Sequence, residues 1–168
     1  MKKYLLLIAL VAGCGASDRD ERNRSVVPEG KSAQPAPAAT QASLTGLYEG
    51  GAASAPSQLC VIEKGGQAHF GMVVWGANLS ACGGAGLVER DGDRLRFRMT
   101  GDQACTVSAR ISGGRISLAS SLAPGCSYYC GARVSFEGVA FDRKGSSPAD
   151  AMKARDPAGD PLCSGQDS

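Results

Sequence analysis

The sequence predicts an all-β domain, a small antiparallel eight-stranded barrel that is held by disulfides and followed by a short C-terminal helix. Three observations predict it. Short runs of alternating apolar and polar residues recur about every 8–12 residues. Glycine accounts for 23 of the 168 residues, roughly twice its usual ~7%, and it separates the runs. Seven cysteines are present. A β-sandwich is the alternative, but closure into a barrel also removes exposed sheet edges.

Eight runs follow one another from Leu44 onward. The most regular is Arg94–Met99, in which arginine alternates with apolar residues, so one face of this strand is buried and the other is solvated. Gly-Gly and Asp-Gly pairs between runs indicate turns, and they occur at Gly50-Gly51, Gly65-Gly66, Gly83-Gly84, Asp91-Gly92-Asp93 and Gly113-Gly114. The predicted strands are Leu44–Glu49, Gln58–Lys64, Gln67–Trp75, Gly86–Arg90, Arg94–Met99, Cys105–Ile111, Arg115–Ser121 and Arg133–Phe141.

The pattern changes once, near the C-terminus. Ser147 precedes Pro148, which is the order expected of an N-cap and a first helical residue. Asp150 lies in the first turn and Arg155 in the last, as the helix dipole favours. We therefore expect a helix over about 148–156, lying against the sheet or across one barrel mouth. The barrel domain spans 44–163, and 164–168 form a disordered tail.

The N-terminus carries an export signal. Lys2 and Lys3 precede an apolar run of nine residues, which as a helix would rise about 14 Å, far less than a ~30 Å bilayer core. The run ends in Val11-Ala12-Gly13-Cys14, which resembles the lipobox of bacterial envelope lipoproteins. The resemblance implies that 1–13 are removed as a signal peptide and that Cys14 is acylated. An ordinary signal peptide cleaved after Ala16 is the alternative.

The lipobox resemblance also implies a location. Gly15, not aspartate, follows the cysteine, and in Gram-negative lipoproteins this pattern implies transfer to the outer membrane, facing the periplasm or the cell surface. Residues 14–43 are rich in Ala, Ser, Gln and Pro, and such a composition buries too little apolar surface to fold. We expect this segment to be a disordered tether between the lipid anchor and the barrel.

Six cysteines remain in the domain, and an even set in an exported chain predicts disulfides. Turn positions predict the pairs 60–82, 105–126 and 130–163, and an exchange of Cys126 with Cys130 is the main alternative. No C-x-x-C pair is present, so we expect neither a metal site nor a cofactor. The set comprises Cys60, Cys82, Cys105, Cys126, Cys130 and Cys163.

Charge and residue types argue against several functions. The net charge of +2 comes from Lys2 and Lys3, so cleavage before Cys14 leaves 16 basic and 16 acidic residues, and a nucleic-acid partner is not expected. His69 is the only histidine, and without a nucleophile elbow we expect it to be a solvent-facing strand residue and expect no catalytic site. The stripe of Arg94, Arg96 and Arg98, flanked by acidic residues, predicts a solvated outer face, with an anion site as the alternative.

Three aromatic residues are candidates for binding. Trp75 ends a predicted strand, where a rim residue would lie. Tyr128 and Tyr129 lie between two cysteines, so disulfides could present them rigidly, and aromatic residues on rigid loops are common recognition anchors. The alternative is that Trp75 plugs the barrel and the tyrosines cover its end.

We therefore expect a monomeric, non-enzymatic module that binds a protein or another envelope component. Thr45-Gly46-Leu47-Tyr48 is similar to a Ser-Gly-x-Tyr fragment of the small-barrel lysozyme inhibitors. Gly46-x-Tyr48 is also similar to the Gly-x-Trp of lipocalins, which implies a small-ligand carrier as the second hypothesis and requires a hollow barrel. The inward set around Phe97 predicts a filled one. A hydrolase is the third hypothesis.

The lipobox makes the first testable prediction. Mass spectrometry of the protein purified from membranes should find a chain that begins at Cys14 and carries acyl chains on its sulfur and amino terminus. The variant Cys14→Ser should leave the membrane fraction, because several buried acyl chains, at about 0.8 kcal/mol per CH₂ group, provide the anchor. An unmodified chain that begins at Ser17 would contradict the prediction.

Overall fold

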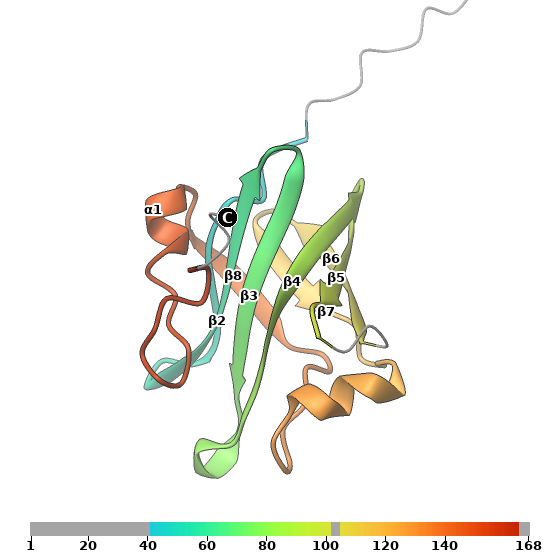
Figure 1. The fold of residues 1–168 in the computed structure, drawn as a ribbon, viewed down its shortest axis with the longest axis vertical. Helices are drawn as coiled ribbons and strands as arrows, with labels where there is room; N and C mark the ends of the chain where they lie inside the picture. Colours follow the sequence, from blue (N-terminus) through green and yellow to red (C-terminus); the bar gives the residue numbers. More distant parts are fainter. Residues whose placement is uncertain (1–40, 102–104, 165–168) are drawn as a thin grey trace, which may run out of the picture. The chain divides into compact units, whose positions relative to one another are not determined.

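Eight antiparallel strands pair in sequence order, and the first pairs with the last, so the sheet closes into an up-and-down barrel (Figure 1). The structure, a computed structural model, describes residues 41–101 and 105–164. The predicted signal peptide, Cys14 and the predicted tether up to residue 40 lie outside the described residues. The strands are β1 Gly46–Ala52, β2 Ala55–Lys64, β3 Gln67–Trp75, β4 Ala81–Asp91, β5 Arg94–Met99, β6 Thr106–Ser112, β7 Arg115–Leu118 and β8 Ala140–Gly145.

The barrel confirms the predicted fold class and excludes the sandwich. Two of the predicted strands, β3 and β5, have the predicted bounds. The predicted turn at Gly83-Gly84 is wrong, because both glycines lie inside β4, opposite Val73 and Met72 of β3. A Cβ atom on Gly84 would lie 2.5 Å from the Met99 sulfur. Here glycine provides room for the Met99 side chain. A glycine pair in the sequence can indicate either such close packing or a turn, and the pattern alone does not distinguish the two.

Other strands begin or end at residues different from those predicted, because part of the predicted strand lies in a loop or part of a predicted turn lies in the strand. Gly50-Gly51 lies within β1, and the turn follows it. The last strand begins at Ala140 and not at Arg133. The preceding loop instead places Phe136 in the core, and a turn residue with positive φ, Gly138, then leads into the strand. The predicted strand thus combined two features, a loop that buries Phe136 and the start of β8. Both contribute apolar residues, so the hydrophobic pattern did not show where the loop ends.

The barrel interior is filled by side chains. Inward positions alternate along each strand, and the aromatic residues Tyr48, Phe70, Phe97 and Phe141 at these positions have no exposed surface, as is also true of Phe136 from the loop before β8. The rings of Phe70 and Phe97 pack edge to face with centroids 5.0 Å apart. Close packing of this kind is typical of a small barrel whose core is solid.

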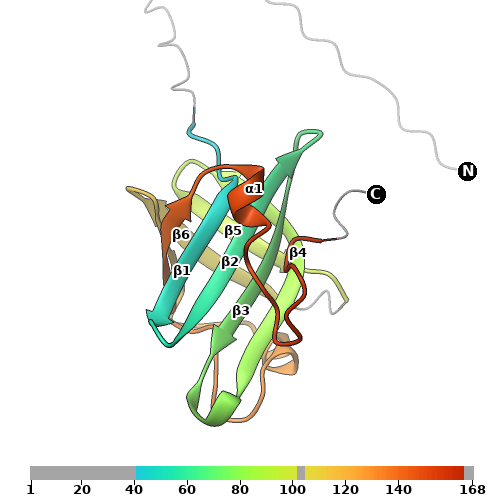
Figure 2. The same cartoon turned by 90° about the vertical axis from the view of Figure 1, so that its left-hand side faces the viewer.

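A second, smaller core lies on the outside of the barrel. Helix α1, Pro148–Ala151, and the segment after it cover the outer face of β1 to β3 (Figure 2). Ala151, Ala154 and Cys163 of this segment pack against Leu47 and Cys60 of the strands. The C-terminal segment therefore lies against the sheet, which is one of the two predicted positions, and not across a mouth.

Helix α1 is shorter than the predicted 148–156. Its start is as predicted, because the Ser147 side chain caps the Asp150 N–H and the Asp150 carboxylate accepts from the Ser147 N–H, which completes a capping box. Hydrogen bonds from Lys153 and Ser147 lower the pKa of Asp150 to about 2. Past Met152, the Ala154 carbonyl accepts from the Leu162 N–H at 3.0 Å. The Ala154 carbonyl thus bonds to the returning C-terminal segment, and the helix does not continue past this point.

The disulfides are Cys60–Cys163, Cys82–Cys130 and Cys105–Cys126. The predicted 105–126 pair is present, but the pairs 60–82 and 130–163 are wrong, as is the alternative that exchanges Cys126 with Cys130. Cys82 belongs to the interior core, whereas Cys60 belongs to the outer one. Side chains on a strand point alternately to the inside and the outside of the barrel. Cys82 points inward and Cys60 outward, so the sheet lies between their sulfur atoms. Disulfides persist in oxidising compartments, so the protein resides outside the cytoplasm.

One mouth of the barrel is closed by the chain that leads into β1. Leu44 is buried in the interior core. The carbonyl oxygens of Ser43 and Leu44 accept hydrogen bonds from Arg143 Nη2 at 2.8 Å and from Tyr48 Oη at 2.7 Å. Burial raises the pKa of Tyr48, although Arg143 beside it acts in the opposite direction, so the phenol remains a donor at neutral pH.

An acidic residue completes the closure of this mouth. Glu63 accepts a hydrogen bond from the Ser43 hydroxyl, and its N–H donates to Thr45 Oγ1 at 3.1 Å. Burial acts to raise the pKa of Glu63, but hydrogen bonds from Ser43, Leu44 and Thr45 outweigh it and hold the pKa below its usual value. Gln41 to Ser43, which the sequence assigned to the tether, therefore belong to the folded domain.

The outer core depends on one glycine, and this dependence makes the second prediction. A Cβ atom on Gly71 of β3 would lie 2.3 Å from the Leu162 carbonyl oxygen. Gly71→Ala should lower the free energy of unfolding by about 1–3 kcal/mol, the cost of overpacking, and should expose the segment after α1 to proteases.

The matched control is Gly83→Ala on the neighbouring strand, where the nearest atom to an added Cβ is 3.7 Å away. Chemical denaturation and limited proteolysis should show little change for this control. Equal effects of the two substitutions would contradict the proposed contact.

Candidate functional site

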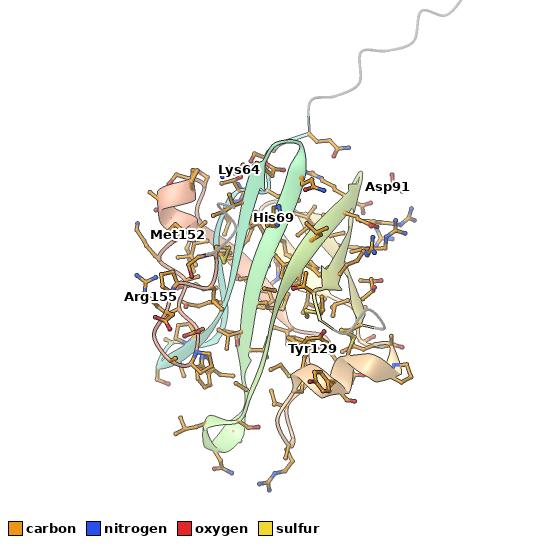
Figure 3. The ribbon with its side chains drawn as sticks, viewed as in Figure 1. Lys64, His69, Asp91, Tyr129, Met152 and Arg155 are labelled. Carbon is orange, nitrogen blue, oxygen red and sulfur yellow. A yellow bond between two sulfur atoms is a disulfide. The ribbon has the colours of Figure 1, made fainter. Side chains whose placement is uncertain are left out.

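The predicted aromatic candidates lie toward the end of the barrel opposite the closed mouth. Two segments form this end, Gly76–Ala81 with the short helix η1 (Ala77–Leu79), and Pro124–Ser135 with the short helix η2 (Pro124–Tyr129). We call these two segments the disulfide-framed end. Figure 3 shows Tyr129 at this end and Lys64 at the other.

Covalent and hydrogen bonds hold the two segments together. Cys130 is bonded to Cys82 of β4, and Cys126 to Cys105. The Gly131 N–H donates to the Ala81 carbonyl at 2.9 Å, and the Ser80 hydroxyl donates to the Ala132 carbonyl at 2.8 Å. The loops are thus fixed to the barrel at several points, which lowers the entropy that binding would remove.

The two tyrosines have different surroundings. Tyr128 is 79% exposed, whereas Tyr129 is half-buried, packs against the interior core and donates from its hydroxyl to the Thr100 carbonyl at 3.3 Å. Their rings meet edge to face with centroids 5.4 Å apart. Tyr129 therefore supports Tyr128, and Tyr128 is available to a partner.

Trp75 neither plugs the barrel nor joins the tyrosine pair. It is half-buried at the end of β3, next to the inward-facing Val74, and strand alternation directs its side chain outward. Its backbone N–H donates to Ser57 Oγ at 3.0 Å. Trp75 lies at the base of the η1 loop and not in the exposed part of the site.

Leu79, which no sequence pattern singles out, is the most exposed large apolar side chain of the described residues at 86%. It also has a left-handed backbone, with φ of 60°, and it follows Asn78 at 58°. Arg133, at 64°, is the only other residue besides glycine with positive φ in the described chain. A bulky side chain in this conformation costs about 1–2 kcal/mol. No sequence signal marks a leucine for this backbone, although Asn78 is a residue that adopts it.

The disulfide-framed end differs in composition from the rest of the protein. Its only charged residue is Arg133, whereas 20% of the whole chain is charged. Tyr, Ser, Gly and Asn provide most of its other polar or flexible positions. Low charge with exposed tyrosine is typical of the centres of protein interfaces, and Tyr, Ser, Gly and Asn are the residues that binding loops on β scaffolds use.

The other predicted positions lie elsewhere. His69 is half-buried on β3, beside Ile62 and Leu87 of the neighbouring strands. The resemblance to lysozyme inhibitors and lipocalins rests on Gly46 and Tyr48, and the Tyr48 side chain is fully buried. Within 41–101 and 105–164 no three His, Cys, Asp or Glu residues are grouped to hold a metal ion.

Comparisons with protein-family models, curated proteins and solved structures found no match for the chain. In the described part of the chain, no helix has the length and apolar character needed to span a bilayer.

Backbone strain at Leu79 makes the third prediction. Leu79→Asn should raise the free energy of unfolding by up to about 1 kcal/mol, because asparagine adopts the left-handed conformation at lower cost and the leucine side chain buries little surface. Urea denaturation measures the change. The converse variant Asn78→Leu should lower the free energy of unfolding, and a loss of stability in Leu79→Asn would contradict the strain.

Proposed function

We propose that the protein is an outer-membrane lipoprotein, anchored through an acylated Cys14 and facing the periplasm or the cell surface. Its barrel is a non-enzymatic module that binds a protein partner through the disulfide-framed end. One observation carries the proposal. The two most exposed large apolar side chains, Leu79 and Tyr128, and every strained non-glycine residue of the described chain lie at this one charge-poor end. Strained backbone concentrates at functional sites.

The filled interior supports a binding surface over a carrier. A lipocalin-like carrier needs a hollow barrel with a cavity on the order of 300 Å³ or more. Here five fully buried aromatic side chains occupy the space between the strands, and the lead-in to β1 closes one mouth through Leu44. A ligand therefore binds to the outer surface or to one end of the barrel and not inside it.

The position of the site relative to the chain also supports the proposal. Gln41, where the described chain begins, lies at the mouth together with Glu63, and the disulfide-framed end lies at the opposite pole of the barrel (Figures 1 and 3). The chain therefore enters the described domain at the pole opposite the proposed site. A partner can then bind there without displacing the anchor.

A protein partner fits the chemistry of this end better than a membrane surface does. Peripheral membrane contacts combine apolar residues with clusters of Lys and Arg that attract anionic lipids. The disulfide-framed end has the single basic residue Arg133. It has instead an exposed tyrosine that is supported by a second ring, which is the form of an anchor at a protein interface.

The fourth prediction tests this function by site-specific photo-crosslinking in intact cells. A photoreactive residue in place of Tyr128 should yield a discrete protein adduct. The same residue in place of Lys64 or Arg155, which are exposed and lie away from this end (Figure 3), should not. Adding Leu79→Asn to the Tyr128 probe should lower the adduct yield about fivefold, because exposed apolar anchors dominate interface energies.

Leu79→Asn should not destabilise the fold, so a lower yield reports binding and not unfolding. Equal adducts from Tyr128 and Lys64 would contradict the proposed site. Adducts to lipid alone would contradict a protein partner.

A further inference from the structure

A hollow of about 540 Å³ lies on the side of the barrel that β4 to β7 form. Its lining includes the exposed side chains of Arg94 and Arg96 on β5 and of Arg110 on β6. Two small polar residues also line it, Ser108 opposite Arg96 and Ser117 opposite Arg110. The volume falls in the range of about 300–1,000 Å³ that is usual for small-molecule sites. We call this hollow the arginine groove.

The arginine groove is open to solvent and separate from the regions described above. Asp91, at its rim, lies on the opposite side of the barrel from Met152 and Arg155 of the C-terminal segment (Figure 3). The tyrosines and Leu79 do not line it. A ligand in the groove would therefore meet neither the C-terminal segment nor the proposed protein partner.

Two of its arginines face each other directly. Arg94 is the cross-strand partner of Arg110 on the outer face of β5 and β6. Like charges in this position destabilise a sheet. Arg110 is paired with Asp93, but of the described acidic residues none lies at ion-pair distance from Arg94. Of these two arginines, Arg94 is thus the one without an ion-pair partner among the described residues.

Acidic residues on the β4 side limit what the groove can hold. Glu89 accepts hydrogen bonds from Arg96 at 3.0 Å and from Arg98 at 2.8 Å, and these arginines lower the pKa of Glu89. Asp91 is the cross-strand neighbour of Arg94. Both carboxylates line the groove opposite the arginines of β5 and β6, so a negative group of a ligand is attracted on the β5–β6 side and repelled on the β4 side. A ligand with one negative charge and several uncharged hydroxyls fits this division.

We propose that the arginine groove binds an acidic sugar, meaning a saccharide unit with one carboxylate. Guanidinium groups bind carboxylates through paired N–H donors, and Arg94 and Arg110 supply them from neighbouring strands. The hydroxyls of Ser108 and Ser117 donate to and accept from ring hydroxyls. Glu89 and Asp91 accept hydrogen bonds from further sugar hydroxyls on the opposite side.

This inference is independent of the protein-binding function, because the two surfaces share no residue. The inference also explains why the β5–β6 pair retains Arg94 opposite Arg110. Asp93 already neutralises Arg110, and a bound carboxylate would neutralise Arg94, which has no ion-pair partner among the described residues.

The test is a titration of the full chain, in nonionic detergent, with glucuronate followed by NMR. Glucuronate should give saturable shifts at residues of the groove. Arg94→Gln and Arg110→Gln should each weaken binding about tenfold, since a charge-assisted bond to an ion contributes on this scale. The matched control is Arg115→Gln on β7, an exposed arginine that pairs with Asp142 outside the groove, and it should bind as the unaltered protein does.

Other probes distinguish a sugar site from simple charge attraction. Glucose should bind more weakly because it lacks the carboxylate, and acetate and inorganic phosphate because they lack the hydroxyls. Arg94→Gln should leave the free energy of unfolding unchanged or higher, because it removes the repulsion from Arg110. Absence of saturable shifts, equal loss in Arg115→Gln, or equal affinity for acetate, phosphate or glutamate would each overturn the proposal.

Discussion

The alternation of side chains across a closed sheet is the constraint on which the rest of this structure depends. Each strand places every second residue in the barrel and the others outside, and closure leaves no edge at which this division relaxes. The inward set fills the barrel with aromatic rings. The outward set forms a second core only where helix α1 and the C-terminal segment cover it. The same division keeps Cys60 and Cys82 apart and so selects the disulfide partners.

Different structures cover the two ends of the barrel. At one mouth the chain's own lead-in enters the core with Leu44, and Arg143 and Tyr48 bond its carbonyl groups. At the other end two disulfides hold loops that carry exposed apolar residues. The first arrangement satisfies backbone acceptors. The second leaves the side chains of Leu79 and Tyr128 exposed to water.

Two positions in this molecule hold a residue in a locally unfavourable setting. Leu79 occupies a left-handed backbone that costs free energy, and its side chain gains little from burial. Arg94 opposes Arg110 across two strands. In both cases a more stable residue is available for the position. The filled core and the three disulfides provide the stability against which such local costs are small.

The sequence by itself determined the fold class, the presence of disulfides and most strand positions, because these depend on local alternation, turn residues and an even cysteine count. β5 is the clearest case, since its alternation of arginine and apolar residues identifies it as a strand without information from any other segment. Only the tertiary structure decided the pairs of Cys60 and Cys82, the role of Gly84 and the exposure of Leu79. The disulfide pairs and the packing beside Gly84 depend on which distant segment covers each face of the sheet, and the exposure of Leu79 depends on the left-handed backbone of the η1 loop. No local pattern contains that information.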